Sequence, residues 1–193
     1  MPLTSNDTKL STNVSPYIPG AWPYFLQALT WAKSYSLNVI VDIHGAPGSQ
    51  NGYDNSGQRI SSPMWASNQS NVQKTIDCVM FLVKNAGDKI DILEVMNEPA
   101  GFLGSSFTNV LRQYYIEVYD SIRMAFGNVT GVMFSDGFLG LDVSTLTEMG
   151  KVVAQSTTQY WAGSFNPPQY KSTSFDIVCC LSSQLLRLSL TVT

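Results

Sequence analysis

An apolar run that ends in a carboxylate puts the strongest constraint on how this chain folds. The run 92–96 has the character of a β-strand, and Asn97 and Glu98 follow it directly. Pro99 then stops further strand pairing, because proline has no backbone N–H to donate. In a chain that alternates strands with helices, a carboxylate at the carboxyl end of a strand lies where α/β barrels carry catalytic groups.

The rest of the chain alternates helical and strand patterns. Apolar residues at helical spacing predict helices over 22–36, 68–86, 108–126 and 144–155. Either Asn68 or Ser70 is expected to cap the second of these helices. Strands are predicted at 38–43, 90–96, 131–135 and 175–178, with polar loops over 1–19 and 45–67. Strands separated by single helices form right-handed βαβ units, so we expect one α/β domain with a parallel sheet.

Composition argues against several classes of function. Charged residues make up 13% of the chain, the net charge is −3 and no basic patch occurs, so a nucleic acid is not the expected partner. No apolar run approaches the roughly 20 residues of a membrane span, and the first 16 residues show no signal peptide. Three cysteines, two of them adjacent, and a single histidine predict neither a disulfide framework nor a zinc site.

A second motif surrounds the only histidine, His44. The segment 42–57 reads Asp-Ile-His-Gly-Ala-Pro-Gly-Ser-Gln-Asn-Gly-Tyr-Asp-Asn-Ser-Gly. It closely resembles the strand-3 signature of fungal-type exo-β-1,3-glucanases in glycoside hydrolase family 5. The segment 93–99 resembles the strand-4 signature of the same family, and the resemblance extends over about 17–178.

The resemblance implies a (β/α)8 TIM barrel. A complete barrel needs about 250 residues, whereas this chain has 193 and shows four strand–helix units. We therefore expect one incomplete barrel domain over 1–193 that contains about strands 3 to 6. Residues 179–193 form a tail that matches nothing in the family.

The resemblance also implies a retaining enzyme that releases glucose from the ends of β-1,3-glucan chains. Glycoside hydrolysis of this type uses two carboxyl groups, and Glu98 matches the family's acid/base. Asn97 matches the residue that holds the 2-hydroxyl of the reacting sugar, and Tyr53 an aromatic residue that stacks on a sugar. The remaining matched sugar-binding positions are His44, Asp54 and Asn55.

No second catalytic carboxyl is matched. Glu94 lies inside a strand, where we expect it to be buried, and Glu117 and Glu148 lie inside predicted helices. Because the family's nucleophile belongs to a strand 7 that no segment matches, we expect the chain to be inactive by itself. The resemblance further implies no cofactor, a β-glucan polysaccharide or oligosaccharide as partner, a monomer, and a location outside the cell or in the cell wall.

Three alternatives remain open. The specificity could be a related one, such as β-1,6-glucan or a simple β-glucoside. The chain could bind glucan without cleaving it, or it could be a truncated product with no stable fold. In each folded alternative, Glu98, His44 and the loop 53–55 should cluster at one end of the sheet, because the two strand exits are neighbours.

Overall fold

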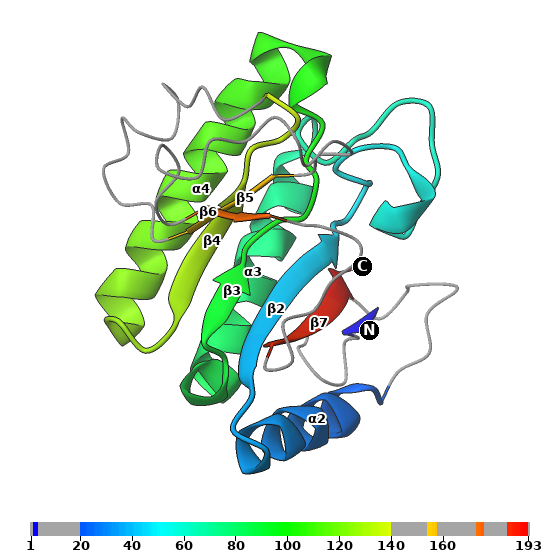
Figure 1. The fold of residues 1–193 in the computed structure, drawn as a ribbon. Coiled ribbons are helices and arrows are strands. Elements are labelled where there is room, and N and C mark those ends of the chain that lie inside the picture. The colour runs from blue at the N-terminus through cyan, green and yellow to red at the C-terminus, as the bar shows by residue number, and fades with distance from the viewer. Residues whose placement is uncertain (1, 4–19, 140–153, 158–172, 176–184, 193) are drawn as a thin grey trace.

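The computed structural model describes residues 2–3, 20–139, 154–157, 173–175 and 185–192, with side chains for 20–139. Its helices are α2 (Trp22–Ser34), α3 (Gln69–Ala86) and α4 (Ser105–Phe126), with short 3-10 turns η1 (Asp54–Ser56), η2 (Gly87–Lys89) and η3 (Gly101–Leu103). Its strands are β1 (Pro2–Leu3), β2 (Asn38–Gly45), β3 (Ile92–Glu94), β4 (Gly131–Ser135), β5 (Ala154–Thr157), β6 (Thr173–Phe175) and β7 (Leu185–Val192) (Figure 1).

All strands join one parallel sheet. The strand order is β1-β7-β2-β3-β4-β5-β6, so β2 to β6 follow one another as they do along the chain. Ile40 of β2 is paired with Ile92 of β3, and Ile92 is paired with Gly131 of β4. Because every pairing is parallel, the carboxyl ends of these strands meet at the same end of the sheet.

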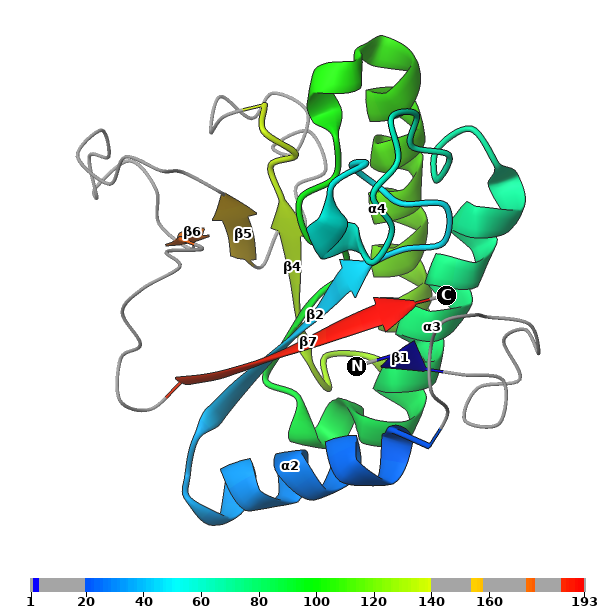
Figure 2. The same cartoon turned by 90° about the vertical axis from the view of Figure 1, so that its right-hand side faces the viewer.

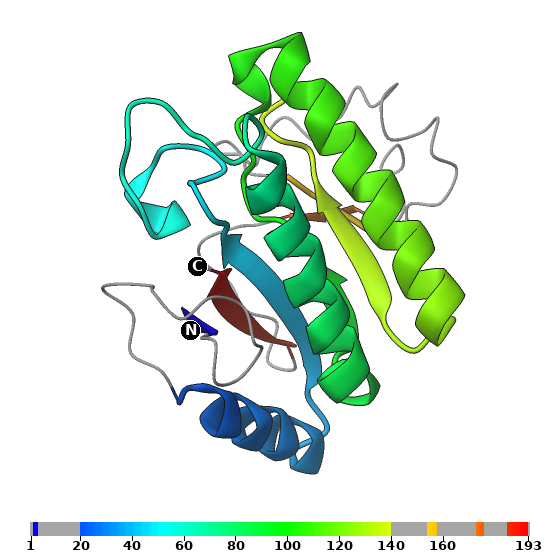
Figure 3. The same cartoon turned by 180° about the vertical axis from the view of Figure 1, so that it is seen from behind.

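Helices α3 and α4 cover the same face of the sheet (Figure 3). Alternate residues of β2, namely Val39, Val41 and Ile43, are fully buried and belong to the same apolar core as residues of α3 and α4. Leu82 of α3 and Val118 of α4 are likewise fully buried in this core. Removal of this apolar surface from water is the main force that fixes the helices to the sheet.

Two adjacent tyrosines of α4 anchor that helix to the strand ends. The hydroxyl of Tyr114 donates to the carbonyl of Val95 over 2.7 Å, and that of Tyr115 donates to the carbonyl of Ser135 over 3.0 Å. Burial raises the pKa of both phenols well above its usual value, so both remain protonated donors. These bonds hold α4 against the segments that follow β3 and end β4.

The opposite face of the sheet carries a smaller apolar cluster and two acids. Ile40 and Met133 pack together there, with Ile92 against them. Asp42 and Glu94 are paired neighbours in the register of β2 and β3, and both are almost completely buried. The burial of Glu94 agrees with the sequence-based prediction.

Local signals predicted several element boundaries correctly. Strand β4 covers the predicted residues 131–135, and α3 begins after Asn68, whose side chain accepts a hydrogen bond from the Ser70 N–H. This is the N-cap arrangement that asparagine favours. Helix α2 ends at Ser34, and α4 begins three residues before the predicted start at 108.

Other boundaries differ from the prediction. Strand β3 has three residues, 92–94, and so covers only the middle of the predicted strand 90–96. Residues 154 and 155 belong to β5 instead of the end of a helix, and 144–153 lie outside the described residues. The predicted last strand is shifted to 173–175, while 176–178 are not described.

Besides β5, two strands come from segments with no strand prediction. Residues 2–3 form β1, although 1–19 were expected to be loop and 4–19 are not described. Residues 185–192 of the unmatched tail form β7, which lies between β1 and β2 (Figure 2). The sheet is therefore larger than the four predicted strands.

Among the described residues, the helices are all too short or too polar to span a membrane.

Candidate active site

The exits of β2 and β3 bring the two sequence motifs together. The backbone N–H of Asn97 donates to the carbonyl of Ile43 over 2.9 Å, so the segment after β3 runs beside the end of β2. Asn97 is almost completely buried there. A side-chain hydrogen bond between Asn55 and Glu98 then joins the loop after β2 to the segment after β3. The predicted clustering of these segments at one end of the sheet is confirmed.

Glu98 has an unusual backbone conformation. Its φ is +45°, in the left-handed region that residues with a Cβ seldom adopt. The side-chain amide of Asn51 donates to the Glu98 carbonyl over 2.9 Å, and that of Asn55 donates to Glu98 Oε2 over 2.6 Å. Glu98 as a whole residue is partly exposed. The loop after β2 therefore holds both the backbone and the side chain of Glu98.

Gln50 connects the two strand exits from within the loop. Its Nε2 donates to the carbonyls of His44 and Asn97, both over 2.9 Å, and its Oε1 accepts the Ala46 N–H over 3.0 Å. Its own backbone carbonyl accepts the Ala100 N–H over 3.0 Å. This fully buried amide thus has its side-chain polar atoms paired, as burial requires.

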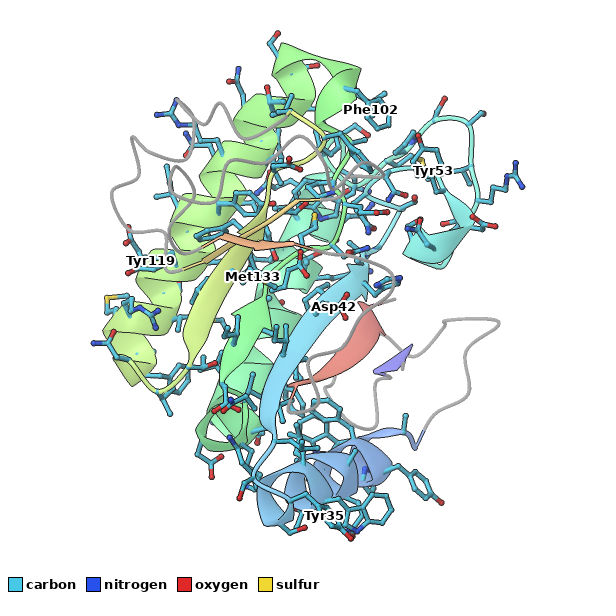
Figure 4. The ribbon with its side chains drawn as sticks, viewed as in Figure 1. Tyr35, Asp42, Tyr53, Phe102, Tyr119 and Met133 are labelled. Carbon is cyan, nitrogen blue, oxygen red and sulfur yellow. The ribbon has the colours of Figure 1, made fainter. Side chains whose placement is uncertain are left out.

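His44 stands at the end of β2 with its ring beside a buried acid. Its Nδ1 lies 2.8 Å from Oδ2 of Asp42, which is two residues earlier and so on the same face of the strand. Asp42 is completely buried, whereas the His44 side chain is about one-third exposed. Figure 4 shows Asp42 near the end of β2 toward which the strand arrow points. The acid therefore orients the ring from the protein side.

Exposed aromatic rings lie beyond the strand ends. Tyr53 and Phe102 are 49% and 52% exposed, and their ring centroids are 6.2 Å apart. Phe102 also contacts Phe138, at 5.7 Å between centroids. In Figure 4, Tyr53 and Phe102 both lie past the carboxyl end of the sheet. Asp54, at the start of η1, is exposed beside this group.

Sequence reasoning did not assign four of these residues to the site: Gln50, Asn51, Asp42 and Phe102. The first three lie inside the segment 42–57, so the motif contained them without showing which partners they bind. The glycines of that segment do indicate from the sequence that its backbone turns tightly. Gly52 has a φ of +81°, and a Cβ on it would lie 2.6 Å from the carbonyl oxygen of Ile60.

The described residues contain no group of three or more His, Cys, Asp or Glu side chains that could hold a metal ion. What they bring together is a partly exposed carboxyl, a histidine–aspartate pair, several amides and exposed aromatic rings. Carboxyl groups transfer protons, amides and imidazole form hydrogen bonds with hydroxyls, and aromatic faces stack on apolar faces of a ligand. The set suits a neutral ligand rich in hydroxyl groups.

Comparison with curated proteins gives consistent relatives. The chain is 34% identical over 148 residues to a probable glucan 1,3-beta-glucosidase A of Aspergillus fumigatus (strain CBS 144.89 / FGSC A1163 / CEA10), an alignment that covers 75% of this chain and 35% of the relative. It is 38% identical over 128 residues to a glucan 1,3-beta-glucosidase of Schwanniomyces occidentalis, covering 64% of this chain and 29% of that protein. It is 36% identical over 128 residues to glucan 1,3-beta-glucosidase 2 of Wickerhamomyces anomalus, with 64% and 29% covered.

The chain thus spans about a third of the length of the curated relatives it matches. No protein-family model matches it.

Proposed function

We propose that this chain carries the acid/base half of the active site of a β-glucan hydrolase, a retaining exo-β-1,3-glucanase of glycoside hydrolase family 5. The observation that carries the proposal is the carboxyl group of Glu98, held by Asn55 just beyond the exits of β2 and β3. Its support from comparison is that relatives matching up to 75% of the chain are named glucan 1,3-beta-glucosidases.

In this mechanism Glu98 first acts as an acid. It protonates the glycosidic oxygen as the bond to the anomeric carbon breaks, and it then takes a proton from the water that completes hydrolysis. Its partial exposure leaves it accessible to a ligand beyond the strand ends. Asn97, the preceding residue, binds the 2-hydroxyl of the reacting sugar, a contact that strengthens as positive charge develops on the ring.

The other proposed contacts bind a neutral sugar. His44, Asp54 and Asn55 are hydrogen-bonding groups for the hydroxyls of a terminal glucose unit. The exposed rings of Tyr53 and Phe102 offer apolar faces to the next sugars of the chain. Charged residues make up only 13% of the chain, a composition that is compatible with an uncharged ligand such as a glucan.

The arrangement of the elements supports a barrel. Strands β2 to β6 follow chain order and pair in parallel, and α3 and α4 cover one face only. Single-direction winding of this kind leads to a (β/α)8 barrel, whereas a doubly wound sheet reverses its strand order. In such a barrel the face with Asp42 and Glu94 lies inside.

The proposal also includes a monomeric state and a location outside the cell, both of which the family resemblance implies.

Retaining hydrolysis needs a second carboxyl about 5 Å from the first, as nucleophile. Family resemblance puts that group on a strand that no part of these 193 residues matches. We therefore expect a polypeptide of these residues alone to bind β-1,3-glucan and to release no glucose.

The test combines a pull-down on insoluble β-1,3-glucan with a reducing-sugar assay. The proteins compared are the 193-residue chain, Glu98→Gln, Tyr53→Ala, and Glu117→Gln as a control on the exposed side of α4. Retention of the chain and of Glu117→Gln, weakened in Tyr53→Ala and without sugar release, is the expected result. Turnover that Glu98→Gln abolishes would support the acid role and show that a nucleophile is present. The absence of both retention and turnover would overturn the proposed function. Preferential retention on β-1,6-glucan would change the proposed specificity.

A further inference from the structure

Two asparagine side chains of the loop after β2 contact the same residue, Glu98, at different atoms. Asn51 donates to its backbone carbonyl and Asn55 to its carboxylate oxygen Oε2. The two asparagines are four positions apart, on either side of Tyr53. Glu98 is separated from them by the whole of α3 and β3. The contacts are therefore tertiary, and nothing in the local sequence around Glu98 provides them.

The backbone contact acts where the chain is strained. Glu98 has a φ of +45°, a conformation that is unfavourable for a residue with a Cβ. It also precedes Pro99, and a residue before proline is further restricted in its backbone conformation. Such a conformation persists only when surrounding contacts impose it. Asn51 is well placed to do so, because it is almost completely buried and its Oδ1 accepts the Tyr53 N–H over 2.9 Å.

The side-chain contact acts on the carboxyl group itself. Asn55 Nδ2 lies 2.6 Å from Glu98 Oε2, so the amide donates directly to the carboxyl group. The other polar atom of this amide, Oδ1, is buried and has no hydrogen-bond partner among the described residues. An unpaired buried acceptor of this kind calls for an explanation.

We propose that Asn51 and Asn55 are positioning residues that present the carboxyl group of Glu98 to the glycosidic oxygen, Asn51 through the backbone and Asn55 through the side chain. This inference rests on the proposed function of Glu98 as acid/base. An amide suits the second role, because its NH2 donates to an ionised carboxylate and its carbonyl, after rotation of the amide, accepts from a protonated carboxyl. Asn55 can thus form a hydrogen bond with the Glu98 carboxyl group both when it is ionised and when it is protonated.

The test needs a readout of how Glu98 is presented that does not depend on turnover. A glucose ring fused to an imidazole carries a basic nitrogen at the place of the glycosidic oxygen, where it accepts the proton of the acid. Glucose lacks this nitrogen. The ratio of the two affinities, measured by calorimetry or NMR titration, therefore reports on the acid group separately from general binding of the sugar ring.

The variants remove one donor at a time. Asn51→Asp keeps the acceptor for the Tyr53 N–H but loses the donor to the Glu98 carbonyl. Asn55→Asp keeps the shape of the side chain but replaces its donor. The control is Asn85→Ala, because Asn85 is exposed and its amide donates to the Phe81 carbonyl within α3. Glu98→Gln removes the acid itself.

We expect both aspartate variants to lower the imidazole-to-glucose affinity ratio by about tenfold, the effect of one lost hydrogen bond to a charged or strained group. In Asn51→Asp, affinity for glucose itself should stay within about twofold of the unchanged chain, because no hydrogen bond to the sugar is lost. NMR couplings of the Glu98 backbone should also report loss of the positive φ. The control should change neither quantity.

The outcomes separate the two levels of the proposal. If the unchanged chain and Glu98→Gln have the same affinity ratio, Glu98 is not presented as an acid and the proposed function fails. If the ratio depends on Glu98 but survives in both aspartate variants, only the positioning role is overturned. In Asn51→Asp, an equal fall in both affinities would assign Asn51 to general support of the loop and would overturn its positioning role. Asn55 also contacts the sugar in the proposed function, so for Asn55→Asp only an unchanged affinity ratio overturns the positioning role.

Discussion

The buried carboxylate of Asp42 lies 2.8 Å from Nδ1 of His44, two residues along the same strand. Strand geometry makes this pair possible, because residues i and i+2 project from the same face of β2. When Asp42 is ionised its carboxylate only accepts hydrogen bonds, so the ring nitrogen facing it then carries the proton. Asp42 therefore sets the tautomer of the ring that the proposed site offers to a sugar hydroxyl.

We predict that neutral His44 has its proton on Nδ1. Since His44 is the only histidine of the chain, its two ring nitrogens give a single pair of ¹⁵N signals whose shifts identify the tautomer. Asp42→Asn should allow both tautomers, because an amide offers a donor as well as an acceptor. A neutral ring protonated only at Nε2 in the unchanged chain would contradict the prediction.

The left-handed backbone of Glu98 predicts an unusual ranking of substitutions. Glu98→Gly should be more stable than Glu98→Ala by about 1 kcal/mol, because glycine adopts a positive φ without a Cβ clash. Both variants lose the bond to Asn55 equally, so that loss cancels in the comparison. Urea unfolding of the two proteins measures the difference.

The control for that ranking is the same pair of substitutions at Gln73, an exposed position inside α3. There the alanine variant should be the more stable by about 1 kcal/mol, the usual helix preference. An alanine at 98 that is as stable as glycine would show that the backbone there relaxes easily.

The ion pair between Lys33 and Asp91 predicts a pH-dependent contribution to stability. Partial burial by itself raises the pKa of Asp91, but hydrogen bonds from Lys33 and from the Val39 N–H outweigh it and hold the pKa below its ordinary value of 3.8. A carboxyl whose pKa is lower in the folded state stabilises the fold above its unfolded pKa. That contribution disappears as the pH falls through the folded-state pKa.

Asp91→Asn should therefore lower the free energy of unfolding at neutral pH, by about 1 kcal/mol or less because both side chains are about one-third exposed. Below the folded-state pKa the two proteins should unfold at closely similar urea concentrations once this carboxyl is protonated. A difference that is the same at both pH values would mean that the charge of Asp91 contributes nothing.

The pairing of β7 with β2 predicts that two neighbouring positions of the tail respond differently to proline. Arg187 and Leu188 are paired with Ile40 and Val41 of β2, and successive N–H groups along a strand point to opposite edges. One of the two variants Arg187→Pro and Leu188→Pro must therefore lose a bond to β2, at a cost of about 1–3 kcal/mol, while the other is milder. Equal thermal stability of both variants and the unchanged chain would show that the tail does not pair with β2.

Phe102 predicts a contribution to the binding of longer sugars. Phe102→Ala should weaken binding of a β-1,3-linked glucose trimer by roughly threefold to tenfold, the effect of one lost stacking contact, and change binding of glucose much less. Met124→Ala removes another exposed apolar side chain, on α4, and is the control. Equal losses for glucose and trimer would place Phe102 outside the path of the sugar chain.

The sequence by itself determined the features that depend on neighbouring residues. The apolar positions of α3, the cap expected at Asn68 or Ser70, and the run of β4 are local patterns, and each gave its element close to the observed bounds. The two motifs also fixed which residues leave the ends of β2 and β3. Their meeting at one end of the sheet follows, because parallel neighbouring strands share their exit side.

Only the tertiary structure decided the contacts that hold Glu98. Its left-handed φ, the amide of Asn51 on its carbonyl and the amide of Asn55 on its carboxylate join residues more than a helix and a strand apart. The place of β7 beside β2 was equally hidden, because a strand pattern does not state its partner. Local periodicity fixes where an element lies in the chain. Which distant polar atoms meet depends on how the elements pack, and a buried amide is satisfied only where that packing brings its partner.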